Sequence, residues 1–289
     1  MLIPDDLRTR LRGLRFTARH PALRQGLGQH QGRSRGAGLE FEQYRAYEPG
    51  DEPRRVDWKL YARSDRFFVR EAARDSPLSV WVLLDASASM AQADAARPAY
   101  SKFTAAKLLA ACLAEVATLQ GDSCGIASLS NTGVAVAPSG SGARHRDRLW
   151  LALEPMRTQG EWPIEAQLAP LWERISPETV VVIISDGLDA ALPAFAARLA
   201  AARRQVLSLG LISCEERDFP FAGGYVFVDP ETGAECRSDG AAARAEFLAR
   251  FAAARTALAR ELARCGIRHV DHCLDEAPDV PLRQLLART

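Results

Sequence analysis

The second part of the sequence contains three continuous apolar runs, which predict buried strands. The runs cover residues 80–84, 180–185 and 206–212. A strand that is apolar at every position is typical of a parallel sheet whose two faces are covered by helices. Helical periodicity fills the intervals between the runs, at residues 102–119, 146–153, 164–175 and 191–203. This alternation of strands and helices is typical of an α/β fold.

Weaker patterns complete this part of the chain. Further strands are predicted at 125–129, 134–137 and 267–270, and further helices at 241–264 and 281–288. Turn residues at 229–233 predict a hairpin insertion near residues 225–238. We therefore predict that residues 77–289 form one α/β domain with a doubly wound, mostly parallel sheet of the Rossmann type.

Residues 1–76 show a different pattern and are predicted to form an N-terminal helix, a glycine-rich loop and a β-containing appendage. Leu7, Leu11 and Leu14 have helical spacing within the Arg-rich residues 2–24. Such a helix could make a peripheral contact with an anionic membrane surface. We favour the alternative that it packs on the domain and keeps its basic face in solvent.

The composition is that of a globular protein. The chain has 289 residues, of which 47% are hydrophobic and 25% are charged, and its formal net charge is +1. This near-neutral balance argues against nucleic acid as a partner, because no global electrostatic attraction to phosphates exists. Only three of the 37 basic residues are lysines, which we interpret as a compositional bias rather than a functional signal.

We expect no membrane span, because no apolar run approaches the ~20 residues that a span requires. Arg8, Arg10, Arg12 and Arg15 interrupt the stretch where a signal peptide would be apolar. The chain is therefore expected to be cytoplasmic. Its six cysteines contain no CxxC pair, and thiols stay reduced in that compartment.

One group of metal-ligating residue types lies near the C-terminus, within the sequence CGIRHVDHC. The group consists of Cys265, His269, His272 and Cys273. A strand through these residues would turn neighbouring side chains to opposite faces. We therefore favour buried thiols and surface histidines over a structural zinc site.

Carboxylates and hydroxyls follow two of the three apolar runs. Asp85, Ser87 and Ser89 come directly after the first run, and Asp186 comes directly after the second. The carboxyl ends of central parallel strands meet at one edge of the sheet, where ligands bind. Carboxylate and hydroxyl oxygens suit Mg²⁺ or Mn²⁺. We therefore predict a divalent-metal site made of these four residues, rather than an Asp85 that only caps the next helix.

These motifs resemble those of known families. DASASM (85–90) and IISDG (183–187) are similar to the metal-ion-dependent adhesion site of von Willebrand A domains. The segment GAGLEFEQYRAYEPGDEPRRVDWKLYARSDRFFVRE (36–71) resembles the signature of the bacterial domain-of-unknown-function family 58 (DUF58), which precedes an A-like domain. The resemblance implies a doubly wound sheet, no established enzymatic activity, and a MoxR-type AAA+ ATPase as partner.

The resemblance also implies a threonine ligand from a middle loop, which this sequence lacks in its usual GGT-like turn. The corresponding residues are TQGEW (158–162), so Thr158 or Glu161 would have to supply the oxygen. For this reason we expect Mg²⁺ or Mn²⁺ to bind weakly or not at all. If Glu161 points to solvent, the proximity of Asp85 and Asp186 should raise the pKa of one carboxyl group.

Residues 39–71 interleave charged and aromatic side chains around a turn at residues 49–51. Their mixed charge argues against a phosphate-binding groove, which would be uniformly basic. Two interpretations stay open, an interaction face and a salt-bridged joint to the main domain. The residues expected at a partner-binding face are Arg45, Tyr47, Asp51, Arg54, Arg55, Asp57 and Trp58.

Together these observations predict a non-enzymatic, metal-dependent protein–protein interaction module that serves as an adaptor for the AAA+ ATPase and other protein clients. A carboxylate of the partner would complete the coordination of the metal. The alternative is a Mg²⁺-dependent hydrolase or phosphotransferase that uses Asp85 and Asp186. The sequence lacks a GxSxG turn, a P-loop and a second acid at position 87, which argues against this alternative.

Overall fold

The computed structural model describes residues 3–17, 41–47, 56–72 and 77–287. They belong to two compact units. The larger unit comprises residues 1–19 and 77–289, and the smaller unit comprises residues 20–76. The larger unit contains the α/β domain that the apolar runs predict.

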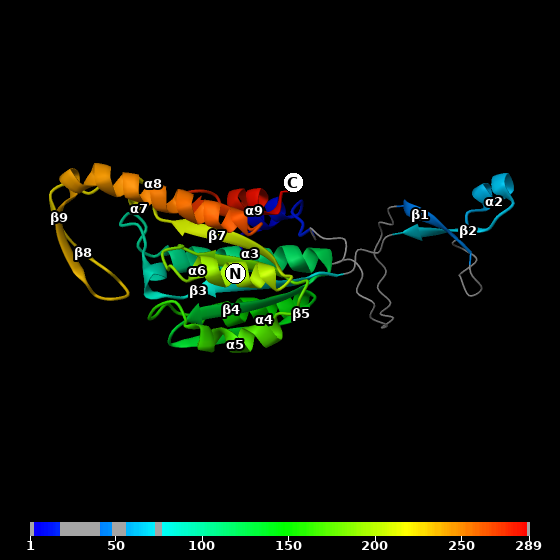
Figure 1. The fold of residues 1–289 in the computed structure, drawn as a ribbon, viewed down its shortest axis with the longest axis horizontal. Helices are drawn as coiled ribbons and strands as arrows, with labels where there is room; N and C mark the ends of the chain where they lie inside the picture. The colour runs from blue at the N-terminus through cyan, green and yellow to red at the C-terminus, as the bar shows by residue number, and fades with distance from the viewer. Residues whose placement is uncertain (1–2, 18–40, 48–55, 73–76, 288–289) are drawn as a thin grey trace. The chain divides into compact units, whose positions relative to one another are not determined.

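A six-stranded sheet forms the centre of the larger unit (Figure 1). Its strands are β3 (Ser79–Asp85), β4 (Ser123–Ser130), β5 (Gly133–Ser141), β6 (Val180–Ser185), β7 (Gln205–Ile212) and β10 (Arg268–Cys273). Their spatial order is β10–β7–β6–β3–β4–β5. Every neighbouring pair is parallel except β4 and β5, which are antiparallel. The strands β3 and β6 are therefore adjacent, parallel and central.

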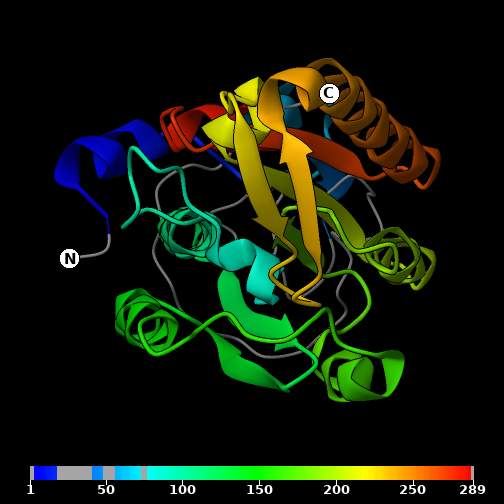
Figure 2. The same cartoon turned by 90° about the vertical axis from the view of Figure 1, so that its left-hand side faces the viewer.

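Helices cover both faces of this sheet, as Figures 1 and 2 show. The helices on one face are α1 (Asp5–Leu11), α3 (Lys102–Gln120), α4 (Ala143–Leu153) and α9 (Asp279–Leu286). The helices on the other face are α5 (Glu165–Arg174), α6 (Leu192–Ala201) and α8 (Gly240–Arg264). A short 3-10 turn, η3 (Ala88–Ala91), follows β3. The predicted doubly wound, mostly parallel α/β fold is therefore confirmed.

The direction of side chains along β3 explains why this strand is apolar throughout. Val80, Val82 and Leu84 point into the core that contains α3. Trp81 and Leu83 point into the opposite core, which contains α6. All five side chains are at most 2% exposed, so a polar group at any of these positions would lose its water without gaining a partner.

Among the described residues, α3 is the one helix that is long and apolar enough to cross a membrane by composition. It has 19 residues with a mean hydropathy of 1.3. The prediction that no apolar stretch approaches this length is wrong for α3. Because 67% of the apolar window is buried inside the fold, the position of α3 in the core accounts for its composition.

The N-terminal helix α1 belongs to the larger unit, whereas the predicted domain boundary sets residues 1–76 apart from the α/β domain. Leu7 and Leu11 are buried in the core that also contains α3 and α9. Arg8 lies 3.3 Å from Glu115 of α3, and Arg10 lies 2.8 Å from Asp279 of α9. The apolar face of α1 thus packs within the domain. The chain passes from the larger to the smaller unit after residue 19 and returns to the larger unit after residue 76.

The described residues of the smaller unit form two strands and a helix. They are β1 (Phe41–Ala46), α2 (Trp58–Ser64) and β2 (Phe68–Ala72). The strands are antiparallel, with an irregularity between Phe41 and Gln43. Asp57 begins α2, because its carboxylate accepts hydrogen bonds from the N–H groups of Lys59 (2.9 Å) and Leu60 (3.1 Å). The smaller unit is the β-containing appendage that the sequence predicts.

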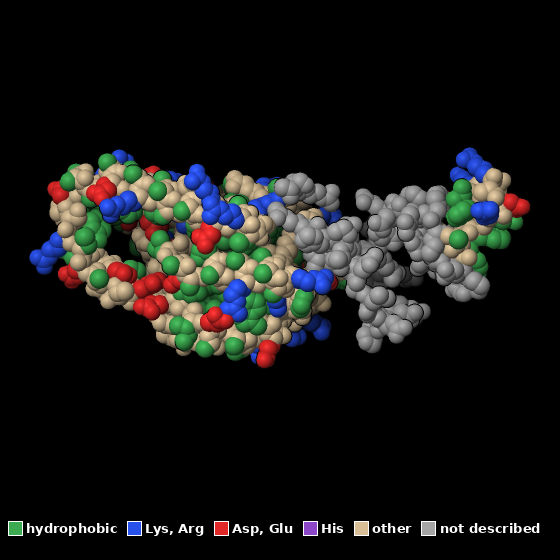
Figure 3. Space-filling view, viewed as in Figure 1, with side chains coloured by type: hydrophobic (Ala, Val, Ile, Leu, Met, Phe, Trp, Pro, Cys, Tyr) green, Lys and Arg blue, Asp and Glu red, His purple; other side chains and the backbone are tan. Residues whose placement is uncertain are grey.

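Between β7 and α8 the chain forms a short helix and a hairpin. They are α7 (Cys214–Asp218), β8 (Gly224–Val228) and β9 (Glu235–Asp239). The side chain of Asp229 accepts hydrogen bonds from Glu231 and Thr232 and so shapes the turn. Figure 2 shows the hairpin in front of the carboxyl ends of the strands, and Figure 3 shows an opening between it and the body of the unit.

Gly125 of β4 leaves room for the indole ring of Trp81. A Cβ at this position would lie 2.9 Å from Cε2 of Trp81 and 3.0 Å from its Cδ2 and Cζ2. We expect Gly125→Ala to lower the free energy of unfolding by about 1–3 kcal/mol, because extra volume in a packed core causes strain. Urea denaturation measures the change. Gly13→Ala is the control, since a Cβ there meets no atom within 4 Å, and equal losses in both variants would contradict the prediction.

Candidate functional site

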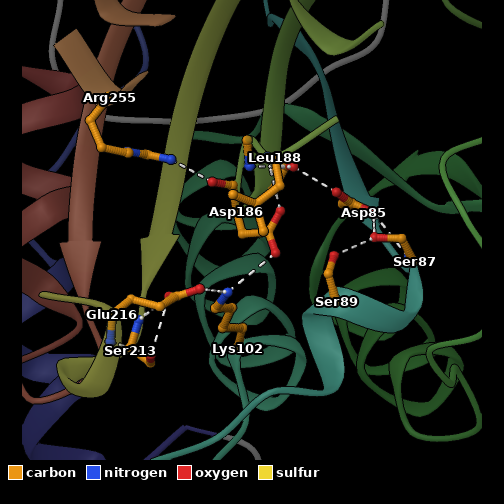
Figure 4. A network of polar contacts seen from close by, with 11 residues as sticks. Asp85, Ser87, Ser89, Lys102, Asp186, Leu188, Ser213, Glu216 and Arg255 are labelled. Carbon is orange, nitrogen blue, oxygen red and sulfur yellow. Dashed lines mark hydrogen bonds and ion pairs between the residues drawn. The ribbon is translucent and has the colours of Figure 1, made fainter. Parts of the chain in front are cut away.

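Asp85 ends β3 and lies at the centre of the site, where it is 1% exposed. Its Oδ1 accepts hydrogen bonds from the backbone N–H and the hydroxyl of Ser87, at 2.9 and 2.7 Å. Its Oδ2 accepts a hydrogen bond from the hydroxyl of Ser185 at 2.6 Å. Ser87 and Ser89 are also buried, and their Oγ atoms are 3.0 Å apart. The structure therefore brings three of the predicted ligands together (Figure 4).

The spacing of these oxygens fits a small divalent cation. Neighbouring ligands of an octahedron with metal–oxygen distances of ~2.1 Å lie about 3.0 Å apart. The hydroxyl oxygens of Ser87 and Ser89 have this spacing, at 3.0 Å. The oxygens of Asp85 and Ser87 are slightly closer, at 2.7 Å. In both chemistry and spacing, these three residues fit Mg²⁺ or Mn²⁺.

The loop after β3 is held in place by backbone hydrogen bonds to the loop between α4 and α5. The N–H of Ala88 donates to the carbonyl of Gly160, and the N–H of Gln159 donates to the carbonyl of Ala86, both at 2.8 Å. Gly160 has a φ of 67°, and a Cβ there would lie 2.0 Å from Oδ1 of Asn131. Glycine is thus required where the two loops meet.

The loop between α4 and α5 is the region from which a threonine ligand is expected. Thr158 is partly exposed, and in the described part of the chain no hydrogen bond joins it to the ligands of the loop after β3. Glu161 is exposed, and its Oε2 accepts a hydrogen bond from Asn131 at 3.4 Å. The structure therefore leaves both predicted substitutes outside the hydrogen-bonded group around Asp85.

Asp186 comes directly after β6 and is 3% exposed. Its Oδ2 lies 3.2 Å from Nζ of Lys102, and its Oδ1 accepts a hydrogen bond from the N–H of Leu188 at 3.2 Å. Arg255 of α8 donates to its backbone carbonyl. In Figure 4 the carboxylate of Asp186 lies between the serine pair and Lys102, and its ion pair is with Lys102.

Lys102 is the first residue of α3 and is fully buried, at 0% exposure. Its Nζ lies 2.5 Å from Oε1 of Glu216 in α7, in addition to its contact with Asp186. The second oxygen of Glu216 accepts hydrogen bonds from the N–H and the hydroxyl of Ser213, at 2.8 and 3.1 Å. A buried ammonium is tolerated here because two carboxylates compensate its charge. Lys102 thereby connects α3 with the end of β6 and with α7.

The network carries more negative than positive charge. Asp85, Asp186 and Glu216 contribute three carboxyl groups. The ammonium of Lys102 pairs with two of them, Asp186 and Glu216, and the guanidinium of Arg255 contacts the backbone carbonyl of Asp186 and forms its ion pair with Asp271. Burial, and then the nearby charge of Asp186, raise the pKa of Asp85 to about 6. The sequence predicts such a shift for the case in which Glu161 faces solvent. The excess of carboxylates favours the binding of a further cation.

Lys102 is the residue of this network that the sequence does not single out. Lysines are scarce in this Arg-rich chain. The scarcity indicates a compositional bias, so it assigns no function to Lys102. A usable signal exists, because Lys102 begins an apolar helix, and the N-terminus of a helix repels a positive charge. A lysine at this position therefore indicates acidic partners from elsewhere in the fold.

The predicted partner-binding residues lie in the smaller unit. Tyr47 and Trp58 are exposed, at 37% and 59%. Asp57 is buried, and its carboxylate caps the N-terminus of α2. Its side chain is therefore not available to a partner at the surface. The backbone of Arg45 belongs to β1. The residues that lie outside the described part of the chain are Asp51, Arg54 and Arg55.

The four residues considered for zinc have separate surroundings. His269 makes hydrogen bonds of 2.9 Å with Ser208 and with Asp271. His272 is fully buried, Cys265 is exposed after α8, and Cys273 is buried at the end of β10. The strand β10 turns His269 and His272 to opposite faces, as the period of two predicts. The expectation of buried thiols and surface histidines is wrong for Cys265, which is exposed, and for His272, which is buried.

A family model and several relatives match most of this chain. The model of the family described as "Protein of unknown function DUF58" matches residues 43–257. An uncharacterized protein of Mycobacterium bovis is 29% identical over 244 residues, which cover 83% of this chain and 76% of that protein. An uncharacterized protein of Mycobacterium tuberculosis gives the same values.

Two solved structures are also similar. An aerotolerance-related membrane protein of Bacteroides fragilis is 18% identical, with a TM-score of 0.45, over 73% of this chain and 100% of that chain. The VWA domain of SpRpn10 is 12% identical, with a TM-score of 0.40, over 73% of this chain and 94% of that chain. These likenesses concern the fold alone.

The raised pKa of Asp85 should make the metal-free protein less stable as the pH rises. Between pH ~4 and ~6 the folded protein keeps a proton on Asp85 that the unfolded chain releases. The stability from this group is thus present below the unfolded pKa and lost as the pH rises through about 6. We expect Asp85→Asn to match wild type near pH ~4 and to exceed it above pH ~6 by up to about 3 kcal/mol.

Urea unfolding in EDTA across this pH range measures the effect. Asp189→Asn is the control, because Asp189 is only partly buried and accepts a hydrogen bond from Ala191 in the same region. A difference between Asp85→Asn and wild type that does not change with pH would contradict the assignment.

Removal of the Lys102 ammonium should leave two carboxylates without their compensating charge. We expect Lys102→Met to lower the free energy of unfolding by about 3–5 kcal/mol, as for other broken buried ion pairs. Lys107→Met is the matched control, since Lys107 donates to the backbone carbonyls of Glu154 and Met156 instead of to carboxylates. Adding Asp186→Asn and Glu216→Gln to Lys102→Met should restore part of the loss. Equal losses in the two lysine variants would show that the buried ion pair adds no stability.

Proposed function

The chain belongs to the DUF58 family, and we propose that it is a non-enzymatic, metal-dependent protein–protein interaction module. The observation that supports this most strongly is the group of oxygens at the carboxyl end of β3. The side-chain oxygens of Asp85 and Ser87 are 2.7 Å apart and those of Ser87 and Ser89 are 3.0 Å apart, close to the spacing of neighbouring metal ligands. The surrounding excess of negative charge adds to the attraction for a cation.

Three residues of the loop after β3 would hold the ion, namely Asp85, Ser87 and Ser89, with Asp186 beside them. A bound Mg²⁺ or Mn²⁺ would supply positive charge and an open coordination position that suits a carboxylate of a partner. Weak binding is expected for two reasons. Among the described residues no hydrogen bond joins Thr158 or Glu161 to the group, and Lys102 already compensates the charge of Asp186.

The hydrogen bonds of the two serines favour binding over catalysis. The hydroxyl of Ser87 donates to the carboxylate of Asp85 and contacts Ser89, and no histidine contacts either serine in the described part of the chain. A phosphotransferase that uses Asp85 would normally carry a second acid at position 87, where this chain has a serine. The alternative of a Mg²⁺-dependent hydrolase or phosphotransferase that uses Asp85 and Asp186 therefore takes second place.

We propose a MoxR-type AAA+ ATPase as the partner, on the basis of the family resemblance. Because such an ATPase consumes ATP, this partnership would place the chain in the cytoplasm. Exposed aromatic side chains of the smaller unit offer a second contact surface. Tyr47 and Trp58 each pack against the ring of Phe67, which is 46% exposed. Aromatic residues of this kind are enriched at protein interfaces.

Metal binding is tested by thermal unfolding at increasing Mg²⁺ and Mn²⁺ concentrations. The melting temperature of the wild type should rise, because a ligand of the folded state stabilises it by about 2.7 kcal/mol at 100 times its Kd. Asp85→Ala should abolish the rise, and Asp189→Ala should retain it. A rise that survives Asp85→Ala would place the ion elsewhere. A wild type that does not respond even at concentrations on the order of tens of millimolar would end the metal-dependent proposal.

The partner is tested by co-purification of the full chain with the ATPase in ATP and Mg²⁺. We expect a complex with wild type and a weaker complex with Asp85→Ala. This variant is more informative than EDTA, because EDTA also removes the Mg²⁺ that the ATPase needs. Trp58→Ala examines the smaller unit in the same assay. If wild type and the ATPase form no complex at concentrations on the order of micromolar, the proposed partner is wrong.

A further inference from the structure

Two cysteines from distant parts of the sequence meet at the carboxyl end of the sheet. Cys214 is the first residue of α7, and Cys273 is the last residue of β10. Parallel pairing sets Cys273 beside Ile212, two residues before α7 begins, and the next residue, Leu274, donates to the carbonyl of Ile212 at 3.0 Å. The Sγ atoms of the two cysteines lie 3.8 Å apart.

This separation is that of two thiolates on one tetrahedral metal ion. Two Zn–S bonds of ~2.3 Å that meet at a tetrahedral angle place their sulfurs about 3.8 Å apart. A disulfide bond would require the sulfurs to approach to about 2.05 Å. The observed distance of 3.8 Å thus suits coordination without movement of either side chain.

A carboxylate completes a set of three candidate ligands. An oxygen of Asp275 and the two sulfurs all lie within 4.8 Å of one another. Asp275 is exposed and Cys214 is partly exposed, whereas Cys273 is 6% exposed. The group therefore has an open side for an incoming ion and a buried side that fixes its geometry.

A cation from the protein already lies among these ligands. The Nη1 atom of Arg217 is 3.2 Å from the sulfur of Cys273 and 3.0 and 2.9 Å from the two oxygens of Asp275. Its Nη2 atom is 2.7 Å from Asp218. The side chain of Arg217 is 44% exposed, so it can move away while it keeps Asp218 as a partner.

We propose that Cys214, Cys273 and Asp275 form a binding site for a thiophilic divalent metal ion such as Zn²⁺, with water as the fourth ligand. On binding, each thiol releases its proton to solvent, the carboxylate coordinates through one oxygen, and Arg217 leaves. The two sulfur ligands separate this site from the all-oxygen group around Asp85. Because Glu216 follows Cys214 by two residues, the ion would also fix the helix whose carboxylate pairs with Lys102. The proposal does not depend on the proposed function.

Cobalt is the probe of choice, because thiolate-bound Co²⁺ shows a charge-transfer absorption that oxygen ligands do not produce. The full chain, reduced with a phosphine and freed of chelator, is titrated with Co²⁺ and then with Zn²⁺. We expect one Co²⁺ per chain with this absorption, and its loss when Zn²⁺ replaces it. Cys214→Ser and Cys273→Ser should abolish the absorption. Cys236→Ser and Cys265→Ser are matched controls at exposed cysteines and should retain it.

Two further variants distinguish this site from the oxygen group around Asp85 and examine the competition with Arg217. Asp85→Ala should leave the absorption unchanged, since its ligands belong to a different group. Arg217→Gln should lower the Co²⁺ concentration at half-saturation, because the competing cation is gone. The proposal fails if reduced wild type shows no thiolate absorption, or if the absorption survives both Cys214→Ser and Cys273→Ser. It also fails if the two cysteines form a disulfide under mild oxidation while the reduced protein binds no Co²⁺.

Discussion

The parallel pairing of β3 with β6 determines where the groups of the candidate metal site lie. Its register sets Leu84 beside Ile184, so the residues that follow leave the sheet at the same edge. The hydrogen bond between Asp85 and Ser185 therefore joins positions 100 residues apart. Both strands are apolar at every central position because helices cover both faces of the sheet. The site thus depends on burial of the whole sheet and cannot form from either strand alone.

A second dependence is electrostatic. Buried carboxylates that lie close together repel one another. A lysine at the start of α3 compensates this repulsion in the folded protein. Lys102 is compact, strongly charged and flexible, which allows its ammonium to contact Asp186 and Glu216 together. The same ammonium competes with any ion for the charge of Asp186. The metal-free protein is therefore stabilised by a group that also limits its affinity for metal.

The sheet and the loop after β3 could be predicted from sequence because their signals are local. Continuous apolar runs predict buried strands, and residues directly after such strands are known to lie at one edge. The positions of Lys102 and Cys214 could not be predicted in this way. Their partners come from other elements, and the contacts depend on how α3 and α7 pack, which no local pattern encodes. For the same reason the sequence favours packing of the N-terminal helix on the domain but does not identify α3 and α9 as its neighbours.

Aromatic and charged residues of the smaller unit illustrate a further limit. Trp58 and Asp57 are neighbours in a segment for which an interaction face is one of the two interpretations that the sequence leaves open. The structure separates them, because the backbone of α2 requires the carboxylate of Asp57 as a cap while Trp58 projects to the surface. Composition alone cannot distinguish a side chain that binds a partner from one that begins a helix.

The placement of α1 with the larger unit makes the smaller unit an insertion between residues 19 and 77. The smaller unit is therefore joined to the rest of the chain at both of its ends. A protease that cuts one connection leaves it attached through the other, and the released end of the larger unit still carries α1, which is packed in the core. Two cuts are needed to separate the units. Replacing the smaller unit with another domain therefore requires that both junctions be kept. Deleting the first 76 residues would also remove α1 from the core of the larger unit.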